Sequence, residues 1–163
     1  CQKAEDAIDN KASIIILSDR NSDKEHIPIP ALLAASSVHQ YLTNKQKRNQ
    51  AGLIIESGEI REVTHFAELL AFGASAVYPY LAYETIADQF ERENFSEELS
   101  LETAIENYIT AVKKGLLKIM SKMGISTLRS YRFSQLFEVL CILSLNRRQT
   151  KMYSNSLNSF LNL

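Results

Sequence analysis

The amino-acid sequence predicts an α/β fold in which short parallel strands alternate with helices. Three short apolar runs, rich in β-branched residues, are each followed by a polar turn and then by a segment with helical periodicity. Strands separated by helices pair in parallel through right-handed crossovers. A long helix is predicted in the second half of the chain. A small doubly wound sheet and a partial, rudimentary (β/α) barrel satisfy these observations equally well.

We expect the three strands at residues 14–17, 51–55 and 74–78, and Pro79 ends the third. Apolar residues spaced three and four apart predict helices after each strand and again later, at 31–44, 61–72, 80–90 and 101–123.

The two ends of the chain have less regular sequence patterns than the middle. Residues 1–13 are interpreted as a helix end or a linker, and residues 133–143 as a short helix. We place one domain at 1–145 and a poorly specified tail, rich in Asn, Ser and Lys, at 146–163. The absence of an initiator Met suggests a fragment or a processed chain.

Length and composition are those of one globular domain. Of the 163 residues, 45% are hydrophobic and 23% charged, which is ordinary for a soluble protein. No apolar run reaches the roughly 18 residues that a membrane span needs, and no signal peptide is recognisable. We therefore expect a soluble protein without a membrane partner.

Cysteine and histidine usage argues against disulfide and metal chemistry. Cys1 and Cys141 are too far apart in sequence to form a ligand motif, which predicts a reducing compartment. An amino-terminal cysteine can act as a nucleophile, but the first twenty residues hold no glycine loop for an oxyanion. The three histidines form no spaced pair. We expect neither a catalytic role for Cys1 nor a metal site.

Charge is unevenly distributed around a net value of −1. Residues 1–106 hold nine Lys/Arg and eighteen Asp/Glu, whereas residues 107–163 hold nine Lys/Arg and only Glu138. A basic third can meet nucleic acid or an acidic protein surface. No nucleic-acid motif accompanies it, so we expect a protein partner and no nucleic acid.

The end of the long helix is the strongest local pattern. Gly124 follows the periodic run and predicts a left-handed helix end, while Ser100 is a plausible N-cap. Gly115, inside the helix, suggests close packing of the backbone. The apolar face is predicted to comprise Leu101, Ile105, Tyr108, Val112, Leu116, Ile119 and Met123.

A phosphate site is one interpretation of this helix end. Lys118 and Lys122 lie one turn apart on one helix face, and the hydroxyl-rich loop that follows carries Ser126 and Thr127. These four are weak candidates for binding a phosphate such as that of a flavin. The alternative is an ordinary helix end, which is the commoner occurrence.

Polar side chains also collect where the predicted strands end. Asp19 and Arg20 follow the first strand, and Glu56 follows the second. Ligands bind at the carboxyl ends of parallel strands in α/β folds. The alternative is that Asp19 and Arg20 pair with each other or hold the loop. No Walker loop, GxGxxG, CxxC or HExxH motif is present.

Several ordered stretches of the chain resemble one family. Each strand contributes one stretch with the residues that follow it, and the long helix and its end contribute the last. The stretches are Ile15–Arg20 with Ile29–Ala34, Gly52–Glu59 with Arg61–Val63 and His65–Ala67, Pro79–Ala82 with Glu84–Ile86, and Lys114–Lys118, Met120–Thr127 and Ser130–Arg132. Together they are similar to the glutamate synthase large subunit, in the later part of its central domain, before the flavin barrel.

The resemblance implies a function in nitrogen assimilation. Members of the family make two glutamates from glutamine and 2-oxoglutarate, using an amidotransferase domain, a flavin mononucleotide (FMN) barrel and a [3Fe–4S] cluster. Electrons come from ferredoxin or from a subunit linked to a pyridine nucleotide. The central domain links the two active sites. The cytoplasm or the plastid stroma is the compartment it implies.

The chain also departs from that family. The amidotransferase motif, the flavin barrel and the cluster cysteines are missing, and Phe133-Ser134 replaces the usual Gly-Ala after Tyr131 and Arg132. We therefore expect no catalytic, cofactor or metal residue in this segment alone, and structural or interface roles for Asp19, Arg20, Glu56, Tyr131 and Arg132. A stand-alone flavin- or phosphate-binding domain, and a regulatory module docking on a full synthase, remain the alternatives.

Overall fold

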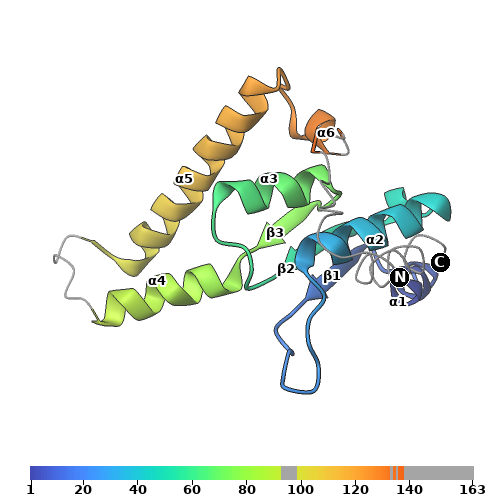
Figure 1. Ribbon diagram of the computed structural model, residues 1–163, viewed down its shortest axis with the longest axis horizontal. Coiled ribbons are helices and arrows are strands. Elements are labelled where there is room, and N and C mark those ends of the chain that lie inside the picture. Colours follow the sequence, from blue (N-terminus) through green and yellow to red (C-terminus); the bar gives the residue numbers. More distant parts are fainter. Residues whose placement is uncertain (93–98, 133, 135, 138–163) are drawn as a thin grey trace, which may run out of the picture.

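The computed structural model describes residues 1–92, 99–132, 134, 136 and 137. Its centre is a parallel three-stranded sheet in the order β1-β2-β3, formed by Ile14–Ser18, Gly52–Glu56 and Ala76–Tyr78 (Figure 1). Ile16 pairs with Ile54, and Ile54 with Ala76. The predicted strands and their parallel pairing are confirmed.

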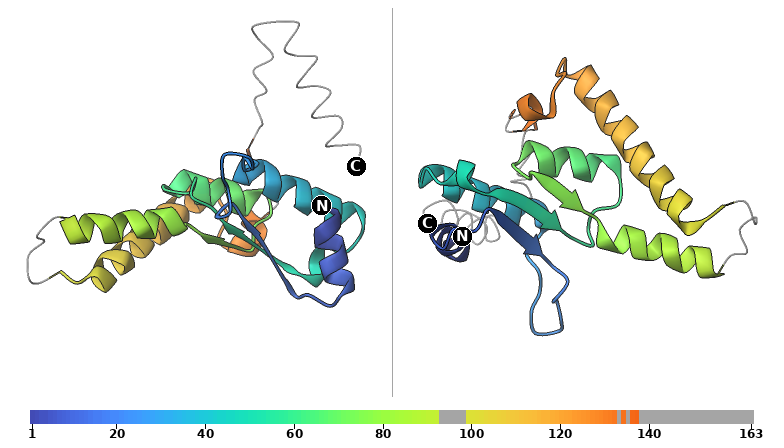
Figure 2. Two further views of the ribbon diagram at one scale, coloured as in Figure 1. Left: turned by 90° about the horizontal axis from the view of Figure 1, so that it is seen from below. Right: turned by 180° about the vertical axis from the view of Figure 1, so that it is seen from behind.

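Helices α2 (Ala31–Asn44) and α3 (Val63–Ala71) pack on one face of this sheet (Figures 1 and 2). That face carries Ile15, Leu53 and Ile55, all buried, and Ala35 of α2 is completely inaccessible. Helix α1 (Gln2–Asp9) adds Ala4 and Ile8 to the same core. Small residues on α2 thus allow the helix to approach the sheet closely.

Helices α4 (Tyr80–Arg92) and α5 (Leu101–Lys122) form an arm that extends from the sheet (Figure 1). Helix α5 returns along α3, and a second core forms there with the short helix α6, Leu128–Tyr131. Gly115 lies at this contact, where an added Cβ would come 2.5 Å from Cγ2 of Val63. The predicted close packing at Gly115 is confirmed. A short 3₁₀ turn, η1, spans Arg48–Gln50.

Three local predictions need correction. Residues 1–13 contain a complete helix, α1, and Lys11, just beyond its C-cap, has a φ of 68°. Met123 is exposed, and Met120 is the methionine that α5 buries, because the contact with α3 fixes which face turns inward. The expected loop after Gly124 contains the helix α6. Most of the predicted helix 133–143 and the tail 146–163 lie outside the described residues.

Candidate functional site

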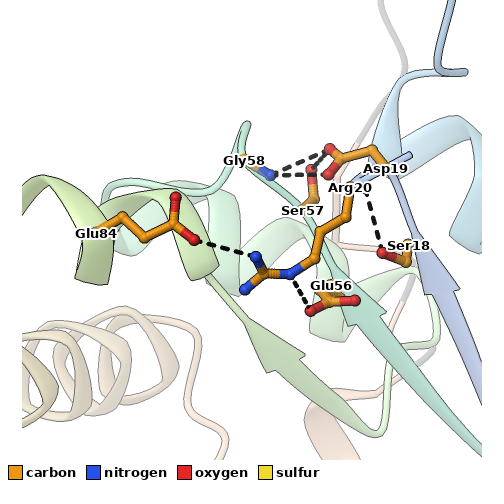
Figure 3. A network of polar contacts seen from close by, with 7 residues as sticks. All are labelled: Ser18, Asp19, Arg20, Glu56, Ser57, Gly58 and Glu84. Atoms are coloured by element: carbon orange, nitrogen blue, oxygen red, sulfur yellow. Dashed lines mark hydrogen bonds and ion pairs between the residues drawn. The ribbon is translucent and has the colours of Figure 1, made fainter. Parts of the chain in front are cut away.

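The polar side chains at the carboxyl ends of β1 and β2 come together as predicted, and they bind one another (Figure 3). Parallel strands in register bring Ser18 beside Glu56. The residues directly after the strands, Asp19 and Ser57, therefore meet at one edge of the sheet.

Asp19 holds the turn that follows β2. Its Oδ2 accepts a hydrogen bond from Ser57 Oγ at 2.5 Å, and the Gly58 amide nitrogen lies 3.1–3.2 Å from both carboxylate oxygens. Ser57 is almost completely buried, so this bond satisfies a hydroxyl that water cannot reach. Ser57 Oγ accepts in turn from the Glu59 amide. Asp19 therefore acts as an internal loop anchor.

Arg20 links the ends of β1 and β2 to helix α4. Its Nε donates to Glu56 Oε1 at 2.6 Å and its Nη1 to Glu84 Oε1 of α4 at 3.0 Å, and its guanidinium carbon lies 4.0 Å from the centroid of the Tyr80 ring. The pKa of Glu56 is lowered by a hydrogen bond from Ser18 and by Arg20, and hydrogen bonding to Glu56 raises that of Arg20. Both groups stay charged near neutral pH.

Asp19 and Arg20 do not pair with each other, so that part of the alternative interpretation is wrong. Its other part, that they hold a loop, is confirmed for Asp19. The cavity beside this network, about 360 Å³, is lined by apolar residues such as Ile16 and Pro28 together with Asp19 and Glu56. Those two carboxylates already accept hydrogen bonds within the chain, so part of the polar lining of the cavity is engaged in internal contacts. The arrangement stabilises the edge of the sheet and offers no nucleophile–base pair.

Metal ligation finds no support in the described part of the chain, which contains no group of three or more His, Cys, Asp or Glu side chains placed to hold an ion. None of its helices is long and apolar enough to cross a membrane.

The phosphate candidates remain at the end of α5. Lys118, Lys122, Ser126 and Thr127 are all exposed. The Thr127 hydroxyl accepts from the Ser130 amide at 3.3 Å and thereby caps α6. The geometry explains the hydroxyl at position 127 as a helix cap.

Tyr131 is the last residue of α6, and Arg132 follows it. Tyr131 is completely buried among Ala67, Leu70 and Met120, and its hydroxyl has no hydrogen-bond partner among the described residues. Burial raises the pKa of Tyr131, and Glu68 adds to the effect. The Arg132 Nη1 donates to Ser75 Oγ at 3.2 Å. Tyr131 therefore packs in the second core, and Arg132 lies near the start of β3.

Several partners in these contacts, among them Glu84, Tyr80 and Glu59, were not among the predicted site residues. Glu84 and Tyr80 complete the Arg20 network from the first two turns of α4. Glu59 accepts a hydrogen bond from the Ala31 amide at 2.8 Å, at the positive end of α2. All three follow strand ends, which was the available signal. Their pairing depends on strand order, which periodicity does not supply.

The fold belongs to the class of barrel-related α/β domains. A solved structure of the flavin-binding domain of baker's yeast flavocytochrome b2 superimposes with a TM-score of 0.60, covering 93% of this chain and 37% of that one at 15% identity. At that identity the likeness concerns the fold alone. Of the two predicted architectures, this likeness confirms the partial barrel and not the doubly wound sheet.

Sequence comparison is more specific. The profile of the family "Glutamate synthase central domain" matches residues 1–143. The NADPH-dependent large chain of Bacillus subtilis is 45% identical over 140 residues, which are 86% of this chain and 9% of that protein. The NADH-dependent enzyme of Schizosaccharomyces pombe is 43% identical over 87% of the chain and 7% of its own length. The ferredoxin-dependent enzyme of Pyropia yezoensis is 41% identical over 86% and 10%.

The chain belongs to the glutamate synthase central domain family. It spans about a tenth or less of the length of the relatives just named.

Proposed function

We propose that this domain is the non-catalytic connector of a glutamate synthase, holding the amidotransferase domain and the FMN barrel at a fixed spacing. Its work is mechanical, so FMN and the [3Fe–4S] cluster belong to the parent enzyme and not to this segment. The partners are the other synthase domains and, for the parent, ferredoxin or a pyridine-nucleotide-linked subunit. The compartment is that of the parent, the cytoplasm or the plastid stroma.

One observation carries this proposal: the edge of the sheet where barrel enzymes bind ligands is occupied by the chain's own contacts. Asp19 is bound to Ser57 and Gly58, and Arg20 to Glu56 and Glu84. Such cross-links join β1, β2 and α4 and oppose their relative movement. A connector needs that stiffness, whereas a catalytic edge needs side chains that can reach a substrate.

A chimeric enzyme tests the proposal. The matching segment of the Bacillus subtilis large chain is replaced by residues 1–143 of this chain, and Arg20→Gln and Asp19→Asn are then introduced. We expect the chimera to make glutamate from glutamine. We expect the two variants to release free ammonia in excess over glutamate formed, while FMN content and ammonia-dependent synthesis stay unchanged. This result is expected because a change in the spacing between the amidotransferase and FMN sites would uncouple them while each site stays intact.

Asp88→Asn is the matched control, because Asp88 is an exposed carboxylate that pairs with Arg92 on its own helix. It should leave the ammonia-to-glutamate ratio at the chimera's value. Loss of FMN from the Arg20→Gln or Asp19→Asn enzyme would contradict a purely mechanical role. Saturable FMN binding by the isolated chain in the micromolar range would replace the connector with the flavin-binding alternative.

A further inference from the structure

A second polar cavity lies at the opposite edge of the sheet, where β2 and β3 begin. Its volume is about 210 Å³, and its lining includes Arg48, Gln50, Ser75 and Arg132. None of the described residues that line it is acidic, whereas two carry guanidinium groups. The cavity is therefore rich in hydrogen-bond donors and poor in acceptors.

Ser75 contributes a donor to this cavity. Its Oγ accepts hydrogen bonds from the Leu53 amide and from Arg132 Nη1, both at 3.2 Å. A hydroxyl oxygen has two lone pairs, and these two bonds use both. The hydroxyl proton is thus left to donate, and no described group accepts it.

Arg132 contributes the charge. A guanidinium has five N–H donors, and among the described residues Arg132 bonds only to Ser75 Oγ. It forms no ion pair with any described carboxylate. The planar fork of an arginine matches a carboxylate or a phosphate with two parallel hydrogen bonds.

Arg48 makes the local field more positive. Its Nε, Nη1 and Nη2 donate to His39 Nδ1, Ala51 O and Gly73 O, which fixes the side chain beside the cavity. Burial lowers the pKa of Arg48, and the positive charge of Arg132 lowers it further. Two guanidiniums that repel each other in a half-buried place favour an anion between them.

We propose that this cavity binds an oxyanion, a phosphate or carboxylate group, held by Arg132 and Ser75 beside the positive charge of Arg48. The group comes either from a free anion or from an Asp or Glu side chain of an adjoining domain. The site is separate from the Asp19–Arg20 network and from the exposed lysines of α5, and it does not depend on the connector role.

Titration of the 163-residue chain tests the proposal. Sodium phosphate and sodium acetate are added separately at constant ionic strength set with sodium chloride, and NMR follows the Nε–Hε signals of the arginines. We expect saturable shifts at Arg48 and Arg132 but not at Arg129, an exposed arginine of α6. We expect Arg132→Gln to weaken binding about tenfold or more, Ser75→Ala to weaken it severalfold, and Arg129→Gln to leave it unchanged.

The two salts distinguish the sources. Tighter binding of phosphate supports a free phosphate group, and binding of acetate at least as tight supports a protein carboxylate. Shifts at Arg132 that fail to saturate, or that match those at Arg129, overturn the proposal. The measurement on the unaltered chain decides this even if Arg132→Gln does not fold.

Discussion

At the scale of single residues, the buried hydroxyl groups differ in whether they have a hydrogen-bond partner. Ser57 is buried and has its partner in Asp19, whereas the buried hydroxyls of Tyr131 and Ser134 have none within the part of the chain that the structure describes. An unsatisfied buried hydroxyl costs about 1–3 kcal/mol. Family resemblance drew attention to Tyr131 from the sequence, but its missing partner depends on α6 packing under α3, which a local pattern does not contain.

Tyr131→Phe should therefore keep the packing and remove the cost. We expect the free energy of unfolding to stay the same or to rise by up to about 1 kcal/mol, measured by urea denaturation. Tyr131→Ala, which removes the ring as well, should lower it by about 3–5 kcal/mol. A loss of more than about 1 kcal/mol in the Phe variant would mean that the hydroxyl has a partner in solution.

The lowered pKa of His39 predicts that the stability of the fold depends on pH. Burial, and then the charge of Arg48, lower its pKa from 6.5 to about 4. Below pH 6.5 the unfolded chain takes up a proton that the folded chain does not, so stability falls as the pH drops from about 6.5 towards 4.

His39→Gln keeps an acceptor for Arg48 Nε and removes this titration. Denaturation between pH 6.5 and 5 should show a shallower loss of stability in the variant, by roughly 1 kcal/mol over that range. Identical pH profiles for the two proteins would show that His39 titrates normally in the folded state.

At the scale of elements, the helix ends follow one rule. After α5 the Ile125 amide binds Met120 O and the Gly124 amide binds Ser121 O, with Gly124 at a φ of 70°. This is a Schellman end, as Gly124 predicted. Helix α2 ends the same way at Gln46, whose φ of 58° is strained for a residue with a Cβ. The sequence indicated the left-handed residue after α5 because it is glycine. It predicted where α2 ends but not the left-handed conformation of Gln46, which is not glycine.

Gln46→Gly should relieve that strain. We expect stability to increase by about 1 kcal/mol, since glycine adopts a positive φ without steric cost. Thermal unfolding would measure the gain, with Gln40→Gly, a mid-helix position on α2, as the destabilising control. A loss of stability in Gln46→Gly would mean that the Gln46 side chain makes a stabilising contact.

A substitution at Gly115 tests the contact between α5 and α3. Alanine there gains about 1 kcal/mol of helix propensity, but its Cβ would collide with the branched side chain of Val63, and overpacking costs about 1–3 kcal/mol. We expect Gly115→Ala to destabilise the chain by roughly 1 kcal/mol. In a Val63→Ala background the same change should stabilise it. A double-mutant cycle without this change of sign would place the helices further apart.

At the scale of the whole molecule, the described helices leave one face of the sheet open. Helices cover Ile15 and Leu53, whereas Ile14 and Ile16 on the other face are 59% and 60% exposed. Figure 2 shows α2 and α3 on the same side of the strands. In a closed barrel this open face would line the interior. Contiguous exposed apolar surface on a sheet favours association between molecules.

Isolated chains should therefore self-associate through this face. Ile16→Thr keeps a β-branched residue and should reduce association, with stability changed by less than about 0.5 kcal/mol. Ile15→Thr, one position away but facing the core, should cost about 2 kcal/mol or more. Sedimentation velocity measures the first effect and denaturation the second. Equal association by the Ile16→Thr and unaltered chains would exclude this face.

The sequence by itself determined the strands, the main helices, their parallel connection and the glycine-marked helix end, because each depends on neighbours within a few residues. It also placed Asp19, Arg20 and Glu56 at one edge, because parallel strand ends coincide. Only the tertiary structure decided that Arg20 reaches Glu84, 64 positions away, and that Arg132 meets Ser75 beside Arg48. Those contacts depend on strand order and on how α4, α5 and α6 return to the sheet, which residues distant in sequence decide together.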